Sequence, residues 1–365
     1  MISIVVTFYD NRRILELCLS QILPTVRDYD VEVIVVDDNP DRPLARKALA
    51  PRSVRLLRSP RNLGYGGACN LGVDAARGAQ VLFVDSDIVP VTGWLDCLLR
   101  TAREKPTAGA IGAKILDLSA GGIVAYGAAI HGVDTVHPYR GNRATYSLAS
   151  QSSDFQLMPS GTLLMSREAF QRIGGFDPIF RNAFGDFDLA MKLWEAGTPA
   201  RICADAVVYH RGAVSGSVRH SNYADTKALF FKRWSSKIQE NGLRFLEDAC
   251  CLLRSRHQLS RKPFLAANLS SSLNWADYLQ AASAALNINI VQTYSFPPPE
   301  RNLSHIRLED SLDWATCRLR TPILYLVDRF RSLFNNHYWF LHRPLSTDIV
   351  IDRNGNAEMV AEWLR

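Results

Sequence analysis

The chain carries the stretch Phe83-Val84-Asp85-Ser86-Asp87-Ile88-Val89 near the end of its first quarter. An apolar run ends there in two carboxylates separated by one residue, and Pro90 follows closely. Alternate side chains share a face on an extended backbone, so we expect Asp85 and Asp87 to converge on one point. Carboxylate oxygens suit a divalent cation that also carries phosphate oxygens, which indicates nucleotide-diphosphate chemistry. Such pairs also occur in solvated turns, so the rest of the chain must decide.

The sequence around this stretch predicts a doubly wound α/β unit with a mostly parallel sheet. Strands are expected at residues 2–8, 31–36, 54–57 and 81–84, and helices at residues 13–23, ended by Pro24, and from the loop 62–72 to about residue 77. The strands are apolar and rich in β-branched residues, as is typical of strands buried on both faces. Ligands bind beyond the carboxyl ends of such strands, where residues 7–10, 37–39 and 85–87 lie.

The later part of the chain predicts a change of architecture. Residues 108–166 are typical of short strands and loops, and a helix at 186–196 precedes a strand at 200–209 that ends at His210. The residues suited to catalysis stop near Ser217. We therefore predict a catalytic domain over residues 1–217 and a mainly helical C-terminal region over residues 218–365. A terminal helical part is expected at about residues 312–341, and its aromatic residues from Leu324 onward suit either an interfacial helix or packing against the catalytic domain.

Composition and charge indicate a packed globular protein with one basic segment. Of the 365 residues 47% are hydrophobic and 21% charged, which leaves room for one large domain with an appendage, or for two domains. The net charge is +6, and residues 211–262 hold eleven basic and four acidic residues, so this segment carries +7 and the remainder −1. Such a segment suits phosphate-rich ligands or an anionic membrane surface, although a solvated helix face explains it equally well. No nucleic-acid reader motif accompanies it, so we expect no nucleic-acid partner.

The seven cysteines show no C-x-x-C pair and no metal-ligand spacing, and several lie in apolar surroundings. The first residues are typical of a strand rather than of a signal peptide, and no apolar run approaches the ~20 residues that span a bilayer. These observations predict a cytoplasmic protein, with the inner face of the membrane as a further location.

The order of motifs over about residues 1–217 resembles that of family 2 glycosyltransferases with the GT-A fold. The matching pieces are Thr7-Phe8-Tyr9, Asp37-Asp38, Asn62-Leu63-Gly64 with Asn70-Leu71-Gly72, Asp85-Ser86-Asp87, Ser160-Gly161-Thr162, Gly174-Gly175-Phe176-Asp177, Gly185-Asp186-Phe187-Asp188 and His210. Each piece is common, but eight pieces in the family's order and approximate spacing are hard to attribute to chance. The loop 62–64 is most similar to that of rhamnosyl- and galactofuranosyl-transferase-like members.

The resemblance implies a donor site at the ends of the first strands. It assigns donor contacts to Thr7, Tyr9, Asp37, Asp38, Asn62, Gly64 and Asp85. A carboxylate accepts hydrogen bonds from a base or ribose, although Asp-Asn-Pro at residues 38–40 also favours a simple turn. The glycines at residues 64–67 could let the backbone approach a phosphate or merely permit a turn, and they do not form a dinucleotide-binding fingerprint.

The resemblance also implies a metal site. It makes Asp87 a direct ligand of Mn²⁺ or Mg²⁺ bound to the donor diphosphate, and His210 a further ligand. An imidazole ligand favours Mn²⁺ over Mg²⁺. An isolated histidine is nevertheless often structural.

Asp186 is the residue that the resemblance implies as the general base of an inverting transfer, at the start of a helix. The family usually has Glu-Asp at this position, whereas this chain has Gly185-Asp186. The same carboxylate could simply cap the helix. Gly161, Thr162 and Asp188 are predicted on the acceptor side.

The sequence therefore predicts a metal-dependent, inverting glycosyltransferase. The expected donor is a UDP or dTDP sugar, and the acceptor is a glycan, a lipid-linked glycan or a small natural product, with peripheral membrane association as a further expectation. Two alternatives remain open. One is a catalytically inactive binding or scaffold protein, which the absent glutamate at residue 185 permits. The other is a sugar-nucleotide nucleotidyltransferase, which would need a glycine-rich loop with Arg or Lys after the first strand, unlike Phe8-Tyr9-Asp10-Asn11.

Overall fold

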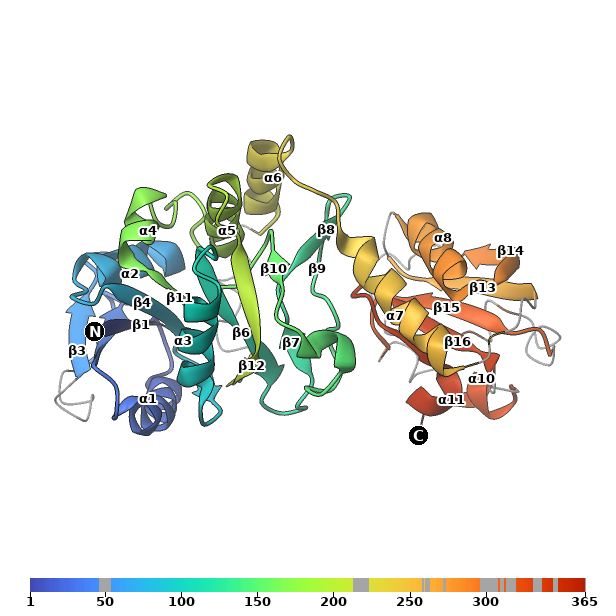
Figure 1. Ribbon diagram of the computed structural model, residues 1–365, viewed down its shortest axis with the longest axis horizontal. Helices are drawn as coiled ribbons and strands as arrows, with labels where there is room; N and C mark the ends of the chain where they lie inside the picture. Colours follow the sequence, from blue (N-terminus) through green and yellow to red (C-terminus); the bar gives the residue numbers. More distant parts are fainter. Residues whose placement is uncertain are drawn as a thin grey trace. The chain divides into compact units, whose positions relative to one another are not determined.

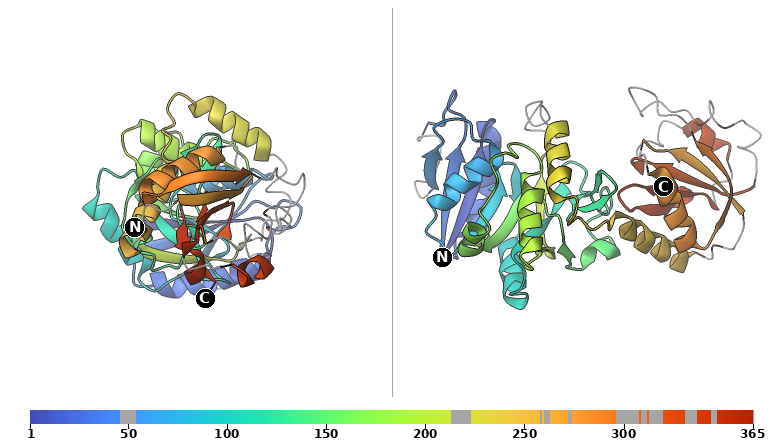
Figure 2. Two further views of the ribbon diagram at one scale, coloured as in Figure 1. Left: turned by 90° about the vertical axis from the view of Figure 1, so that its right-hand side faces the viewer. Right: turned by 90° about the horizontal axis from the view of Figure 1, so that it is seen from above.

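The computed structural model describes residues 1–45, 54–212, 223–257, 259, 263–271, 274–295, 308, 312, 320–330, 337–343 and 347–364. The chain divides into two compact units, each with its own sheet (Figure 1, Figure 2). Unit 1 comprises Met1–Ala128 and Gly141–Gln239, and unit 2 comprises Ala129–Arg140 and Glu240–Arg365. The predicted boundary at residue 217 lies outside the described residues.

Unit 1 is built on a ten-stranded sheet with the order β10-β12-β6-β11-β4-β1-β2-β3, in which β5 also pairs with β12 and β7 with β6 (Figure 1). Its strands are β1 (Ile2–Phe8), β2 (Val31–Asp37), β3 (Val54–Arg58), β4 (Gln80–Asp85), β5 (Ile88–Pro90), β6 (Ala110–Asp117), β7 (Ile123–Ala125), β10 (Asp154–Phe155), β11 (Thr162–Ser166) and β12 (Ala200–His210). The strands β3, β2, β1 and β4 are mutually parallel, as are β6 and β12, whereas β11 runs antiparallel between β4 and β6. The predicted mixed α/β fold with a mainly parallel sheet is confirmed.

Helices cover both faces of this sheet because both faces are apolar. The helices of unit 1 are α1 (Arg12–Val26), α2 (Gly64–Asp74), α3 (Trp94–Glu104), the 3₁₀ turn η2 (Ser147–Ser150), α4 (Arg167–Arg172), α5 (Gly185–Glu195) and α6 (Tyr223–Trp234). Ile4 and Leu82 pack with α1 and α3 in one core, and Trp94 Nε1 of α3 donates to Thr25 Oγ1 of α1 at 3.0 Å. On the opposite face Phe83 contacts Phe170 of α4.

Two predicted features of unit 1 are explained or corrected by this packing. A Cβ on Gly72 would lie 2.4 Å from Val5 Cγ1, so the glycine lets α2 approach β1 closely. Pro24 does not end α1, which continues to Val26 because Ile22 and Val26 are buried in the core and hold the last turn in place.

The described part of unit 2 contains a sheet beside its helices, which the prediction of a mainly helical region over residues 218–365 did not include. Its five-stranded sheet has the order β14-β13-β15-β16-β17, in which the first four strands are mutually parallel and β17 is antiparallel to β16. The elements are the hairpin β8 (Ala129–His131) and β9 (Asp134–Val136), then α7 (Gly242–Arg256), β13 (Pro263–Leu269), α8 (Trp275–Leu286), β14 (Asn289–Ser295), β15 (Ile323–Val327), α10 (His337–Leu341), β16 (Ile349–Asp352), β17 (Ala357–Met359) and α11 (Val360–Trp363). Short apolar runs such as β15 cannot be told from buried helix by periodicity alone, which explains the error.

A buried ion pair fixes the middle of this second sheet. Arg343 and Asp348 are 5% and 0% exposed, and Arg343 Nη2 donates to Asp348 Oδ1 at 2.9 Å. Tyr325 lies in β15 rather than in the predicted interfacial helix, and its hydroxyl donates to Asp348 Oδ2 at 3.2 Å. Burial raises the pKa of the Asp348 carboxyl despite these contacts.

Asp352, at the end of β16, makes the stability of the chain depend on pH. Burial raises the pKa of Asp352 from 3.8 to about 7, although the amides of Asn354 and Asn356 donate to it. Folding therefore favours the protonated form. The stability that this proton contributes is fully present below pH 3.8 and is lost as the pH rises to about 7.

We predict that Asp352→Asn flattens this pH dependence. Between pH 3.8 and about 7 the wild type should lose on the order of 4 kcal/mol of unfolding free energy from this carboxyl group, and the variant should not. Urea denaturation of the full chain at several pH values measures the effect. The control is Asp248→Asn, which changes a half-exposed carboxylate of α7. Parallel pH curves for wild type and Asp352→Asn would contradict the prediction.

Candidate active site

Asp85, Asp87 and His210 form a cluster at one end of the sheet of unit 1. Asp85 is the last residue of β4, and His210 is the last residue of β12. Each offers one ligand atom, and these three atoms lie within 4.8 Å of one another. His210 Nε2 lies 3.1 Å from Asp87 Oδ2, and the two side chains are 18% and 11% exposed. The set combines hard carboxylate oxygens with one imidazole, so it fits a divalent cation such as Mn²⁺.

The short strand β5 brings the histidine to the two aspartates. It follows Asp87 directly and pairs antiparallel with the end of β12, so that Ile88 lies opposite His210. The amide of Arg211 donates to the carbonyl oxygen of Asp87 at 3.2 Å and extends this pairing. The two aspartates and the histidine are far apart in the sequence, and the pairing of β5 with β12 brings them together.

Gly161 lies against the cluster. The Asp85 amide donates to the Gly161 carbonyl at 3.0 Å, and a Cβ on Gly161 would lie 3.1 Å from Asp85 Oδ2. A larger residue at position 161 would therefore push on the carboxylate. Thr162 is 1% exposed and its hydroxyl donates to the Gly161 carbonyl, so in this structure it supports the turn from inside the protein.

Asp37 and Asp38 lie at the carboxyl end of β2, where their carboxylates hold the neighbouring loops. Asp37 Oδ2 accepts from the amide of Leu44 at 2.6 Å. The carboxylate of Asp38 accepts from the amides of Leu63 and Gly64, both at 2.8 Å. Burial raises the pKa of Asp38, and these two amides act in the opposite direction. Both aspartates are thus engaged with backbone, and their contacts to a nucleoside remain a prediction.

The loop at Asn62 and Gly64 is fastened to a distant segment of unit 1. Gly64 has a φ of +74°, and a Cβ there would lie 2.5 Å from the Arg181 backbone oxygen, so only glycine fits. The Arg181 guanidinium donates to the Asn62 carbonyl at 2.7 Å. On β1, Thr7 pairs with Asp85, and Tyr9, just beyond the strand, is 40% exposed. These residues therefore surround the same end of the sheet.

Asp186 lies in the first turn of α5, as predicted, and is half-buried. Its Oδ1 accepts from the amide of Phe187 at 3.0 Å. A Cβ on Gly185 would lie 3.1 Å from the Phe180 carbonyl oxygen, so the backbone closes tightly around the position where the family usually has glutamate. The preceding Phe184 has a φ of +62°.

Tyr65 connects the two parts of the site and was missed in the sequence. Its hydroxyl donates to the Ser160 carbonyl at 3.1 Å and accepts from the Ser160 hydroxyl at 3.1 Å. Burial raises its pKa, and the negative charges of Asp85 and Asp186 raise it further. Both carboxylates are therefore within electrostatic reach of one hydroxyl. A tyrosine between two glycines of a loop was the only signal in the sequence.

Asp188, which was predicted on the acceptor side, is buried in this structure. Its side chain is 0% exposed and accepts from Trp234 Nε1 at 3.0 Å and from Arg233 Nη1 at 2.9 Å. Arg233 belongs to the predicted basic segment, but its charge is paired with that of Asp188. Asp188 therefore supports α5 from within.

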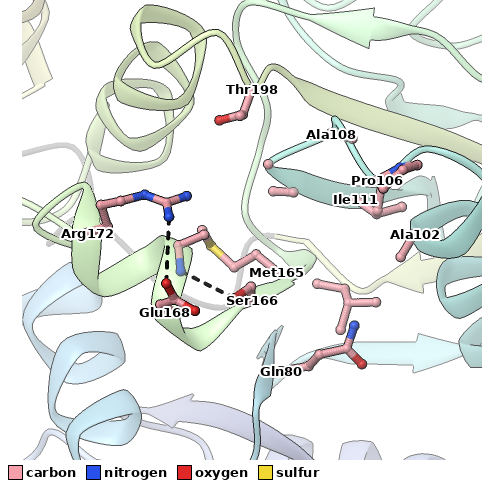
Figure 3. Close-up of a pocket in the computed structure, with 14 residues that line it drawn as sticks. Gln80, Ala102, Pro106, Ala108, Ile111, Met165, Ser166, Glu168, Arg172 and Thr198 are labelled. Carbon is pink, nitrogen blue, oxygen red and sulfur yellow. Dashed lines mark hydrogen bonds and ion pairs between the residues drawn. The ribbon is translucent and has the colours of Figure 1, made fainter.

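A separate pocket of about 350 Å³ lies at the opposite end of the sheet (Figure 3). Gln80 and Ala110 begin β4 and β6, and Ser166 ends the antiparallel β11, so all three mark the amino ends of the parallel strands. The cluster at Asp85 lies at their carboxyl ends. The pocket is therefore distinct from the candidate site.

Unit 1 is thus a parallel-rich α/β protein with an acidic cluster at the carboxyl ends of its strands, where open α/β sheets bind their ligands. Comparison with known proteins adds a family match. Residues 3–174 match the family model described as "Glycosyl transferase family 2". This match covers slightly less than half of the chain, most of it in unit 1.

Several known proteins are similar to the chain. The O-antigen biosynthesis protein RfbC of Myxococcus xanthus is 27% identical over 226 residues, which cover 59% of the chain and 17% of RfbC. A pre-mycofactocin glycosyltransferase of Mycobacterium tuberculosis is 30% identical over 188 residues, which cover 49% of the chain and 37% of that protein. The chain thus spans much less than two thirds of either relative. The mannosyltransferase PcManGT from Pyrobaculum calidifontis, solved with GDP-Man and Mn²⁺, has a TM-score of 0.46 at 20% identity, covering 64% of each chain.

We predict that Asp87→Asn abolishes metal binding at the cluster. Loss of a direct carboxylate ligand should weaken Mn²⁺ by more than the roughly 10-fold to 100-fold that outer-shell changes cause. Electron paramagnetic resonance of titrated Mn²⁺ measures the affinity. Asp205→Asn is the control, because Asp205 lies on the same strand as His210 but pairs with Arg100. Equal Mn²⁺ affinity in Asp87→Asn and Asp205→Asn would show that the cluster holds no cation.

Proposed function

We propose that the protein is an inverting, metal-dependent glycosyltransferase that uses a nucleotide-diphosphate sugar. The observation that carries this proposal is the cluster of Asp85, Asp87 and His210 at the carboxyl ends of the strands. The proposed base, Asp186, lies half-buried in the first turn of α5. A cation site for a diphosphate and a carboxylate for an acceptor hydroxyl are the two elements that such a transfer needs. The match of residues 3–174 to the glycosyl transferase family 2 model supports the same reaction class.

In the proposed reaction Asp186 accepts the proton of the acceptor hydroxyl. The oxygen then forms a bond to the anomeric carbon from the face opposite the leaving diphosphate, which inverts the configuration. The bond between that carbon and the diphosphate oxygen breaks, and its electron pair stays with the nucleotide. Asp85, Asp87 and His210 would hold the Mn²⁺ or Mg²⁺, and this ion would neutralise the charge that develops on the diphosphate.

The other residues of the site support a donor pocket. Asp37 ends β2 and Asp38 follows it, at the same end of the sheet as the cluster. The two aspartates fix the neighbouring loops, including the one from Asn62 to the start of α2 at Gly64. Thr7 and Tyr9 lie beside them at the end of β1. We propose UDP and dTDP sugars as donors on the resemblance of the loop at Asn62, and Mn²⁺ as the preferred ion because His210 is a ligand.

The acceptor is proposed as a glycan, a lipid-linked glycan or a small natural product. Exposed lysines such as Lys232 on α6 favour an acceptor that carries phosphate or lies at an anionic membrane surface. We therefore propose that the protein acts in the cytoplasm or at the inner face of the membrane. Within the described residues no helix is both long enough and apolar enough to cross a membrane.

Calorimetric titration of UDP, dTDP and GDP, each with Mn²⁺, tests the donor site. We expect one nucleotide to bind, to require the metal, and to lose binding in Asp87→Ala. If none of the three binds to folded protein, the inactive scaffold becomes the better explanation. Formation of a sugar nucleotide from a sugar phosphate and a nucleoside triphosphate would instead identify a nucleotidyltransferase.

Asp186→Asn tests the general base. Loss of a positioned base should lower the release of nucleotide from the matching sugar nucleotide by about 10²-fold to 10⁴-fold. Nucleotide affinity should stay unchanged, because the metal ligands are intact. Asp225→Asn, in the exposed first turn of α6, is the control. Full activity of Asp186→Asn would remove Asp186 from the mechanism while leaving the donor site in place.

A further inference from the structure

The helix that carries the proposed base is anchored by a buried carboxylate on the same turn. Asp188 has no exposed surface, and its Oδ1 accepts from Arg233 Nη1 and Trp234 Nε1. Lys192 Nζ, one turn further along α5, lies 3.0 Å from Asp188 Oδ2. A buried carboxylate requires such partners because it has lost its hydration. The last turn of α6 therefore attaches directly to the first turn of α5.

Arg233 also attaches a third segment of unit 1. The same nitrogen, Nη1, lies 2.8 Å from Asp177 Oδ2, and the guanidinium lies 4.9 Å from the centre of the Phe180 ring. Burial alone would raise the pKa of Asp177, but the bonds from the Ile179 amide and Arg233 outweigh it and lower that pKa. Lys192 Nζ donates to the carbonyl of Gly175 at 3.0 Å. The turn at residues 174–177, α5 and the end of α6 thus form one ionic brace.

The brace determines how α5 is rotated about its axis. Successive residues of an α-helix are separated by about 100°, so Asp186 and Asp188 project to nearly opposite sides. With Asp188 directed inward to Arg233 and Trp234, Asp186 is held on the side of the active site. Neither Arg233 nor Trp234 belongs to the metal cluster.

We propose that Arg233 and Trp234 are positioning residues, which act through Asp188 to aim the Asp186 carboxylate at the acceptor hydroxyl. The inference rests on the proposed role of Asp186 as the base. It assigns the end of α6, which follows the metal ligand His210 in the chain, to the acceptor half of the reaction. The donor half, at β4 and β12, does not depend on the brace.

The test compares Arg233→Gln, Arg233→Lys and Trp234→Phe with a matched control. Arg172→Gln is that control, because Arg172 forms an exposed ion pair with Glu168 within α4 and not with the brace. Each full-length variant is titrated with Mn²⁺ and UDP, dTDP or GDP. The release of nucleotide from the corresponding sugar nucleotides, with water as the acceptor, then gives kcat and KM.

We expect Arg233→Gln to lower kcat by about 10²-fold, as a misplacement of about 1 Å does, with KM and nucleotide affinity within about two-fold of the wild type. Trp234→Phe, which loses one donor but keeps a buried ring, should fall between Arg233→Gln and the wild type. Arg233→Lys should recover most of the rate, because one nitrogen makes both carboxylate contacts. Arg172→Gln should behave as the wild type.

Two outcomes would overturn the inference. In the first, Arg233→Gln keeps the wild-type kcat. In the second, kcat and nucleotide affinity fall together in both Arg233→Gln and Arg233→Lys, as in a general loss of structure. The variant Asp186→Asn distinguishes failure of the positioning role from failure of the proposed function. An inactive Asp186→Asn beside a fully active Arg233→Gln rejects only the positioning role, whereas an active Asp186→Asn rejects the base itself.

Discussion

The antiparallel pairing of Ile88 with His210 is the interaction on which the site depends. It folds the chain after Asp87 back onto the end of β12, so that two carboxylates and an imidazole meet within 4.8 Å. Without this short strand, β4 and β12 would remain separated in the sheet by β11 and β6. Backbone hydrogen bonds between β5 and β12 thus bring the side chains of Asp85, Asp87 and His210 together.

The rest of the site follows the same division between scaffold and chemistry. Asp37, Asp38 and Asp188 are buried and accept hydrogen bonds from backbone or from neighbouring side chains, so they shape loops and anchor a helix. Asp85, Asp87 and Asp186 remain half-buried at the surface of the site. Burial therefore distinguishes carboxylates that already hold the protein's own loops and helices from those that remain partly accessible.

Sequence patterns succeeded where they reflect local physics. The strands β1, β2 and β4 are buried on both faces and read as apolar runs, and the polar residues that end them mark the ligand-binding edge. Asp85 and Asp87 were recognisable for this reason. In unit 2 the same reasoning failed, because an apolar run as short as Ile323–Val327 is compatible with both a helix and a strand. The buried ion pair between Arg343 and Asp348 also follows no hydrophobic periodicity that could be recognised in the sequence.

The sequence by itself determined the α/β architecture of unit 1, the candidate metal ligands and the helix that begins at Asp186. Only the tertiary structure decided that Tyr65 bonds to Ser160, that Asp188 faces Arg233 and Trp234, and that the C-terminal region contains a sheet. The physical reason is distance along the chain. Local periodicity fixes which residues share a face, whereas pairings between residues far apart in sequence depend on how sheets and helices pack.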